Sequence, residues 1–157
     1  MKIVFVVGLP GSGKTSYVNQ YIKQNIGFQI ICPDDVRASL GSPYEPRHAP
    51  VIRQVCDVMA RAHLERGINV IVDATNLNLN LLKGYAKLAK EYKYTTSAVV
   101  LDTPEAICRE RRADRIEDFD YSTRFLKWVY AWKELEKDCF SSLRRLFDEI
   151  TIVGGNQ

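Results

Sequence analysis

The sequence predicts an α/β fold: a three-layer sandwich in which a five-stranded parallel sheet carries helices on both faces. Two observations predict it. Short, almost continuously apolar segments alternate with longer segments of helical periodicity, as strands and crossover helices do in parallel sheets, and a glycine-rich loop joins the first strand to the first helix. The 157 residues are 46% hydrophobic and 26% charged. They can bury a core, and we expect one domain over residues 1–157.

Five segments are candidate strands because each is short and rich in Val, Ile or aromatic residues. Strands that are buried on both faces lack the usual alternation of apolar and polar residues, and most of these segments lack it too. They are Ile3–Val7, Phe28–Cys32, Ile68–Val72, Thr96–Leu101 and Glu149–Val153.

Helices are expected between the strands, over residues 14–25, 49–66 and 79–92, where apolar residues recur at helical spacing. Residues 104–147 contain no candidate strand and are rich in arginine. We expect helices there too, with a basic helical lid at about residues 109–120.

The loop after the first strand decides the class of fold. Residues 8–15 read Gly-Leu-Pro-Gly-Ser-Gly-Lys-Thr and match the P-loop pattern G-x-x-x-x-G-K-[ST], between a strand and a helix as the mechanism requires. Backbone N–H groups of such a loop surround a phosphate, and the helix N-terminus adds positive potential. The sequence therefore predicts a P-loop NTPase fold. The expected nucleotide-binding residues are Gly8, Pro10, Gly11, Ser12, Gly13, Lys14, Thr15 and Ser16.

Mg²⁺ is predicted beside the nucleotide. Lys14 is expected to reach the outer phosphates, and the hydroxyl of Thr15 is the expected direct ligand of the ion. Asp73 follows the third candidate strand and is expected to hold the ion through water. An aspartate after a strand also commonly caps the next turn or helix, and the two roles are compatible.

The segment after the second candidate strand supplies candidate catalytic residues. Ligands of open α/β sheets bind at the carboxyl edge, where Asp34 is placed to accept a proton from an attacking hydroxyl. Arg37 lies three residues further on, in a starting helix, and is suited to hold an anionic group of the acceptor. The D-x-x-R spacing alone is common by chance, and either Asp34 or Asp35 is also expected to cap that helix.

Together these motifs resemble the P-loop kinases of the polynucleotide 5′-hydroxyl kinase type. The resemblance rests on residues 8–15, 34–37 (Asp-Asp-Val-Arg), 73–78 (Asp-Ala-Thr-Asn-Leu-Asn) and 89–92 (Ala-Lys-Glu-Tyr). It implies that Asp34 is the general base and that Arg37 contacts the acceptor's phosphate. It also implies that Thr75 and Asn76 lie beside the acceptor, although an inserted Ala74 breaks the register of the family's D-T-N-x-N segment.

The family also carries lid arginines that reach over the transferred phosphate, and residues 109–115 resemble that lid. The spacing favours Arg109 with Arg112 or Arg115 as catalytic residues, while other arginines of the segment are expected to be solvated and paired with Glu110 and Asp114.

Two features near the lid bear on the acceptor. Acidic residues follow it and would repel a phosphate backbone if they faced the acceptor; they are Glu117, Asp118 and Asp120. Aromatic residues then share one helical face, at positions 121, 125, 128 and 132. We expect this face to be a core stripe that docks the last helices, with a platform for stacking bases as the alternative.

The predicted function is ATP-dependent phosphoryl transfer to the 5′-hydroxyl of a DNA or RNA end, with Mg²⁺ as cofactor. Two alternatives stay open: a kinase of the same fold that acts on a small molecule, a nucleoside or a modified DNA base, and a non-catalytic nucleotide-binding module. The lack of an N-K-x-D guanine-reading signature favours ATP over GTP. No protein partner is predicted.

Composition and charge exclude several other classes. The net charge is only +3, which disfavours a surface that coats nucleic acid. The scattered cysteines predict neither a zinc site nor a disulfide framework, and the first apolar run is too short to span a bilayer. We therefore expect a cytoplasmic protein without membrane association.

Overall fold

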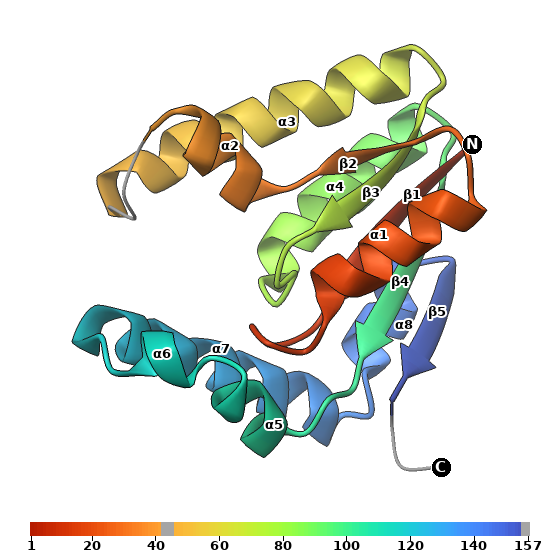
Figure 1. The fold of residues 1–157 in the computed structure, drawn as a ribbon. Coiled ribbons are helices and arrows are strands. Elements are labelled where there is room, and N and C mark those ends of the chain that lie inside the picture. Colours follow the sequence, from red (N-terminus) through yellow and green to blue (C-terminus); the bar gives the residue numbers. More distant parts are fainter. Residues whose placement is uncertain (42–45, 155–157) are drawn as a thin grey trace.

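The computed structural model describes residues 1–41 and 46–154. Its sheet is five-stranded and entirely parallel, in the order β2-β3-β1-β4-β5, and helices cover both faces (Figure 1). The strands are β1 (Lys2–Val7), β2 (Phe28–Ile31), β3 (Asn69–Asp73), β4 (Thr95–Leu101) and β5 (Glu149–Val153). The predicted fold class is confirmed, and each strand lies within one residue of its expected bounds.

The helices follow the expected alternation as well. They are α1 (Lys14–Gln24), α2 (Pro33–Ser39), α3 (Ala49–Glu65), α4 (Leu79–Glu91), α5 (Glu105–Glu110), α6 (Ala113–Ile116), α7 (Phe119–Lys137) and α8 (Ser141–Leu146), with a 3₁₀ turn at Pro46–His48. The residues described between β4 and β5 form only helices and connecting turns, as predicted for 104–147.

The central strand β1 explains why the strands are almost continuously apolar. Ile3, Phe5 and Val7 point into the larger core, which α3, α4, α7 and α8 complete. Val4 and Val6 point to the opposite face, where they pack with Val18 of α1 and its neighbours. Because helices cover both faces, neither set of side chains meets water and no polar alternation is required.

The sheet and its helices place the glycine-rich loop at a crowded edge. The loop follows β1 and leads into α1, and Figure 1 shows it at the carboxyl end of the sheet, between α2 and α3 on one side and α5, α6 and α7 on the other. Residues from three distant parts of the chain therefore meet at one edge.

The start of α2 differs from the prediction. We expected Asp34 or Asp35 to cap this helix, but its N-cap is Cys32, whose side chain makes no capping bond, and Pro33 is the first helical residue. Proline is favoured at that position because its fixed φ suits a helix and its missing N–H leaves no donor unsatisfied. The two aspartates fall in the first turn instead, where the helix dipole favours negative charge.

The aromatic face of α7 is only partly a core stripe. Phe125 and Trp132 are buried, as predicted, whereas Tyr121 and Trp128 are half-buried.

Within the described residues, every helix is too short or too polar to cross a membrane.

Candidate active site

The loop between β1 and α1 depends on glycine for its shape. Gly11 and Gly13 have φ of +87° and +96°, values that other residues rarely adopt. At Gly11 a Cβ atom would also lie 2.7 Å from the carbonyl oxygen of Cys108 in α5. The loop therefore packs directly against the first helix of the expected lid segment.

Lys14 lies over this loop. Its Nζ donates a hydrogen bond to the carbonyl of Leu9 at 2.7 Å. Burial lowers the pKa of Lys14 to about 8 from its ordinary 10.5, and the negative charges of Asp73 and Asp34 oppose this shift. The ammonium group is thus poorly solvated and lies among charged groups. A bound anion would compensate for the solvation that it has lost.

Thr15 and Asp73 come together as predicted. Thr15 Oγ1 donates a hydrogen bond to Asp73 Oδ2 at 2.8 Å, and Asp73, the last residue of β3, is only 7% exposed. Burial raises the pKa of Asp73, although the bond from Thr15 and the charge of Lys14 oppose the rise.

The donor set fits Mg²⁺. A hydroxyl and a carboxylate oxygen are ligand types that this ion prefers, and it usually keeps several waters and binds substrate phosphates as well. In the part of the chain that the structure describes, no cluster of three or more His, Cys, Asp or Glu side chains could hold a metal. The remaining ligands would therefore be water and phosphate.

Asp34 and Arg37 form a pair at the start of α2. Arg37 Nη1 donates to Asp34 Oδ1 across one turn of the helix. The Asp34 side chain is 86% exposed, while that of Arg37 is only 18% exposed. Since the charge of Asp34 affects Lys14 and Asp73, α2 presents this carboxylate to the same site.

The loop after β3 is tied to the P-loop. The carbonyl of Thr75 accepts a hydrogen bond from the N–H of Gly8 at 3.1 Å. The side-chain amide of Asn76 donates to the carbonyls of Val6 and Val72 at 2.8 and 3.1 Å, and its φ of +52° is one that asparagine tolerates well. These bonds fix the turn after β3 that carries Thr75, a structural role of Asn76 that was not predicted from the sequence.

The expected lid arginines separate into two groups. Arg109 bonds to Glu105 at 2.7 Å, and its guanidinium lies 5.0 Å from the centre of the Phe125 ring. Arg115 is exposed. Arg112 is half-buried, and its Cγ lies 3.3 Å from where a Cβ of Gly11 would stand. Its charge also acts on Lys14, so Arg112 is the candidate that lies at the P-loop.

Two further features concern the turn between α5 and α6, which holds Arg111 and Arg112. Among the described residues, Arg112 Nε is buried without a hydrogen-bond partner, as expected of a guanidinium that still lacks an anion. Arg111 Nη1 donates to the carbonyl of Gly11 at 3.0 Å. Arg111 was not among the predicted site residues, because the spacing of the arginines does not indicate which of them faces the loop.

One protein-family model matches most of the chain. The family model described as an AAA domain matches residues 3–132, from β1 into α7. The chain belongs to this family. The match covers the P-loop and the segments that hold Asp34, Asp73 and Arg112.

Individual proteins show more specifically which members this AAA-domain chain resembles. It is 28% identical over 109 residues to a protein of Acanthamoeba polyphaga mimivirus named "Putative bifunctional polynucleotide phosphatase/kinase", a match that covers 69% of this chain and 22% of that protein. A chain in the structure of the Pnkp1/Rnl/Hen1 RNA repair complex superposes with a TM-score of 0.74 at 26% identity, over 87% of this chain and 45% of that one. The predicted resemblance to kinases of the polynucleotide kinase type is confirmed.

A more distant likeness concerns the fold alone. A chain of the PezAT toxin-antitoxin system of Streptococcus pneumoniae superposes with a TM-score of 0.67 at 18% identity, over 96% of this chain and 66% of that one.

The present chain spans only part of its relatives: about a fifth of the mimivirus protein and less than half of the RNA repair protein.

Proposed function

We propose that this domain transfers the γ-phosphoryl group of ATP to the 5′-hydroxyl of a DNA or RNA end. The observation that supports the proposal is the gathering of charged groups around the P-loop. Lys14 Nζ is bonded to the carbonyl of Leu9 in the loop, and the side chain of Arg112, from the turn after α5, lies against Gly11. The charges of Asp34 and Arg112 both act on Lys14. A carboxylate as the base for the acceptor and a cation for the transferred phosphate are the groups that this reaction requires.

The donor side of the site is the P-loop. Its backbone N–H groups and Lys14 bind the phosphates, with contributions from Ser12 and Ser16. Thr15 and Asp73, which are bonded to each other, are the residues that would hold Mg²⁺. When bound, the ion would neutralise charge that develops on the phosphates.

The acceptor side is α2. The Asp34 carboxylate takes the proton of the attacking hydroxyl, and Arg37 holds a phosphate of the acceptor through its planar guanidinium. Their mutual hydrogen bond keeps both groups at the edge of the site before the acceptor arrives. Thr75, on the loop that is bonded to Gly8, is a further residue proposed to contact the acceptor.

The segment 109–120 acts as the lid. Arg112 stabilises the transferring phosphoryl group, since it is the lid arginine whose guanidinium is partly buried at the P-loop. Arg111 holds the lid on the loop through the Gly11 carbonyl.

A polynucleotide acceptor is favoured by the name of a relative, because the mimivirus protein is named a polynucleotide phosphatase/kinase. Of the acidic residues after the lid, Asp118 has a structural role: it caps α7 by accepting a hydrogen bond from the N–H of Tyr121 at 2.7 Å.

Label transfer tests the proposal. The protein is incubated with γ-labelled ATP, Mg²⁺ and either a 5′-hydroxyl oligonucleotide or the same strand already phosphorylated at its 5′ end. We expect label on the first strand alone. Label on neither, with ATP binding intact, would overturn the polynucleotide acceptor and favour a small-molecule acceptor or a binding module.

The lowered pKa of Lys14 predicts how ATP affinity depends on pH. Bound phosphates raise the pKa of Lys14 above its free value of about 8, so above pH 8 binding takes up a proton and the affinity falls by up to about tenfold per pH unit. Calorimetric titration at about pH 9, in two buffers with different ionisation enthalpies, measures that uptake. The Lys14→Arg variant stays charged and is expected to show none. Equal heats in both buffers for the unaltered protein would contradict the prediction.

The lowered pKa of Lys14 also makes the free energy of unfolding depend on pH. Between pH 8 and 10.5 the unfolded chain holds a proton on Lys14 that the folded protein has released. The contribution of this residue to the free energy of unfolding therefore rises with pH across that window.

A further inference from the structure

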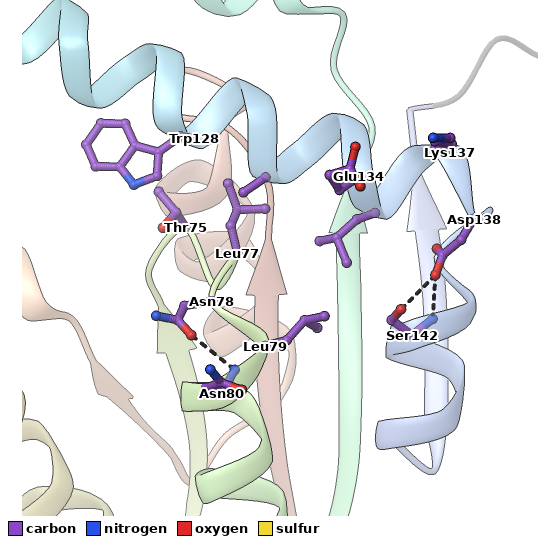
Figure 2. A pocket seen from close by; sticks show the side chains of 12 residues that line it. Thr75, Leu77, Asn78, Leu79, Asn80, Trp128, Glu134, Lys137, Asp138 and Ser142 are labelled. Carbon is purple, nitrogen blue, oxygen red and sulfur yellow. Dashed lines mark hydrogen bonds between the residues drawn. The ribbon is translucent and has the colours of Figure 1, made fainter.

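A pocket of about 910 Å³ lies outside the P-loop, between the loop that follows β3 and helices α7 and α8. Figure 2 shows Trp128, Thr75 and Asn78 gathered at one end of it and Asp138 with Ser142 at the other. None of the roles described above uses this pocket as a whole.

One end of the pocket adjoins the active site. Thr75 lines it, and the carbonyl of the same residue accepts the hydrogen bond from Gly8 in the P-loop. Trp128 also lines it and makes an edge-to-face contact with Tyr121, with the ring centres 6.1 Å apart. Since the charges of Arg112 and Asp34 both reach the Tyr121 hydroxyl, these two rings connect the active site to the pocket.

That end is suited to a flat, uncharged group. Trp128 is half-buried and lines the pocket, whereas Phe125 and Trp132 on the same face of α7 are buried. Beside it, Asn78 Oδ1 accepts hydrogen bonds from the N–H groups of Asn80 and Leu81, at 3.0 and 3.3 Å. Asn78 is exposed, and its amide nitrogen is a donor that a ligand can use.

The other end carries more negative than positive charge. Glu134, Lys137 and Asp138 line it, two carboxylates against one ammonium group, and Asp138 accepts hydrogen bonds from Ser142 at the start of α8. Asp138, which follows the last residue of α7, lies ten positions after Trp128, or about 15 Å further along the helix axis. The net negative charge disfavours phosphate at the far end, while the near end offers an indole ring and amide groups.

We propose that the near end of this pocket binds a nucleobase of the acceptor strand, stacked on Trp128 and bonded to the Asn78 amide. The inference rests on the proposed function and deepens it, because it identifies a subsite for the strand whose 5′ end lies at Asp34. Stacking on an aromatic ring tolerates any base, so this subsite favours a strand with bases over an isolated sugar phosphate without selecting one sequence.

Three variants of α7 test the subsite. Trp128→Leu keeps an apolar side chain but removes the aromatic face, and Trp128→Phe keeps a ring. Tyr130→Leu changes an aromatic residue that is 69% exposed and does not line the pocket. We expect Trp128→Leu to raise KM for a 5′-hydroxyl oligonucleotide about tenfold, with kcat and KM for ATP little changed. Trp128→Phe restores most of the affinity, and Tyr130→Leu has no effect.

A fluorescent base gives a readout that does not depend on turnover. 2-Aminopurine, placed singly at the first or second position of the strand, is quenched when it stacks, so we expect quenching by the unaltered protein and by Trp128→Phe but not by Trp128→Leu. An unchanged oligonucleotide KM in Trp128→Leu, or equal quenching by all variants, would overturn the subsite while leaving the kinase activity established. Quenching that depends on Trp128 without label transfer would support the subsite and overturn the proposed reaction.

Discussion

The Asp34→Asn variant is expected to lose phosphoryl transfer by about 10²–10⁴-fold in kcat, while its affinity for ATP stays close to that of the unaltered protein. The amide keeps the shape of the carboxylate and can still accept a hydrogen bond from Arg37, but it cannot take a proton from the attacking hydroxyl. Steady-state rates with a 5′-hydroxyl oligonucleotide and a separate ATP-binding titration distinguish the two effects.

Asp35 provides the matched control for this experiment. It is exposed, lies in the same first turn of α2 and carries the same charge next to Asp34. Asp35→Asn therefore repeats the change in net charge without removing the proposed base. If both variants lost activity equally, the effect would be electrostatic and Asp34 would not be the base.

Replacing Arg112 with alanine is expected to lower kcat by about 10³–10⁵-fold, the range found when an arginine that stabilises the transferring phosphoryl group is removed. The reason is its position: Arg112 lies against Gly11, acts on Lys14 and has a buried Nε without a partner among the described residues. Single-turnover rates at saturating ATP measure the chemical step.

Arg109→Ala is the informative comparison for Arg112. Arg109 is bonded to Glu105 and lies over Phe125, so we expect its loss to lower the midpoint of thermal unfolding and to change kcat far less. A larger rate loss in Arg109→Ala than in Arg112→Ala would reverse the assignment. Circular dichroism of both variants verifies that the lid helices are folded.

The outline of the fold could be predicted because its signals are local. Unbroken apolar strands imply a sheet covered on both faces, and the structure shows this: α3 and α7 belong to the core on one face and α1 packs on the other. The pairing of Thr15 with Asp73 followed in the same way, since a P-loop and the end of a buried parallel strand meet at one sheet edge.

Other features depended on competing local preferences that only the structure resolves. Two aspartates are good capping residues, yet α2 begins at Pro33 because proline suits the first helical position. Asn76 was matched to an acceptor contact, whereas its amide is bonded to two strand carbonyls. Its proposed contact with the acceptor stays a prediction.

The glycine-rich loop and the alternation of strands and helices could be predicted from residue types and spacing, because each depends on neighbours within a few positions. The same reasoning marked Asp34 as the proposed base, a role that stays a prediction. Which of the several arginines lies at the P-loop could not be predicted from the sequence, because it depends on where α5 ends and on how closely that turn packs against Gly11. The pocket beside Trp128 could not be predicted either. Its walls come from the loop after β3, from α7 and from α8, and side chains so far apart in sequence acquire a common function only when tertiary packing brings those elements together.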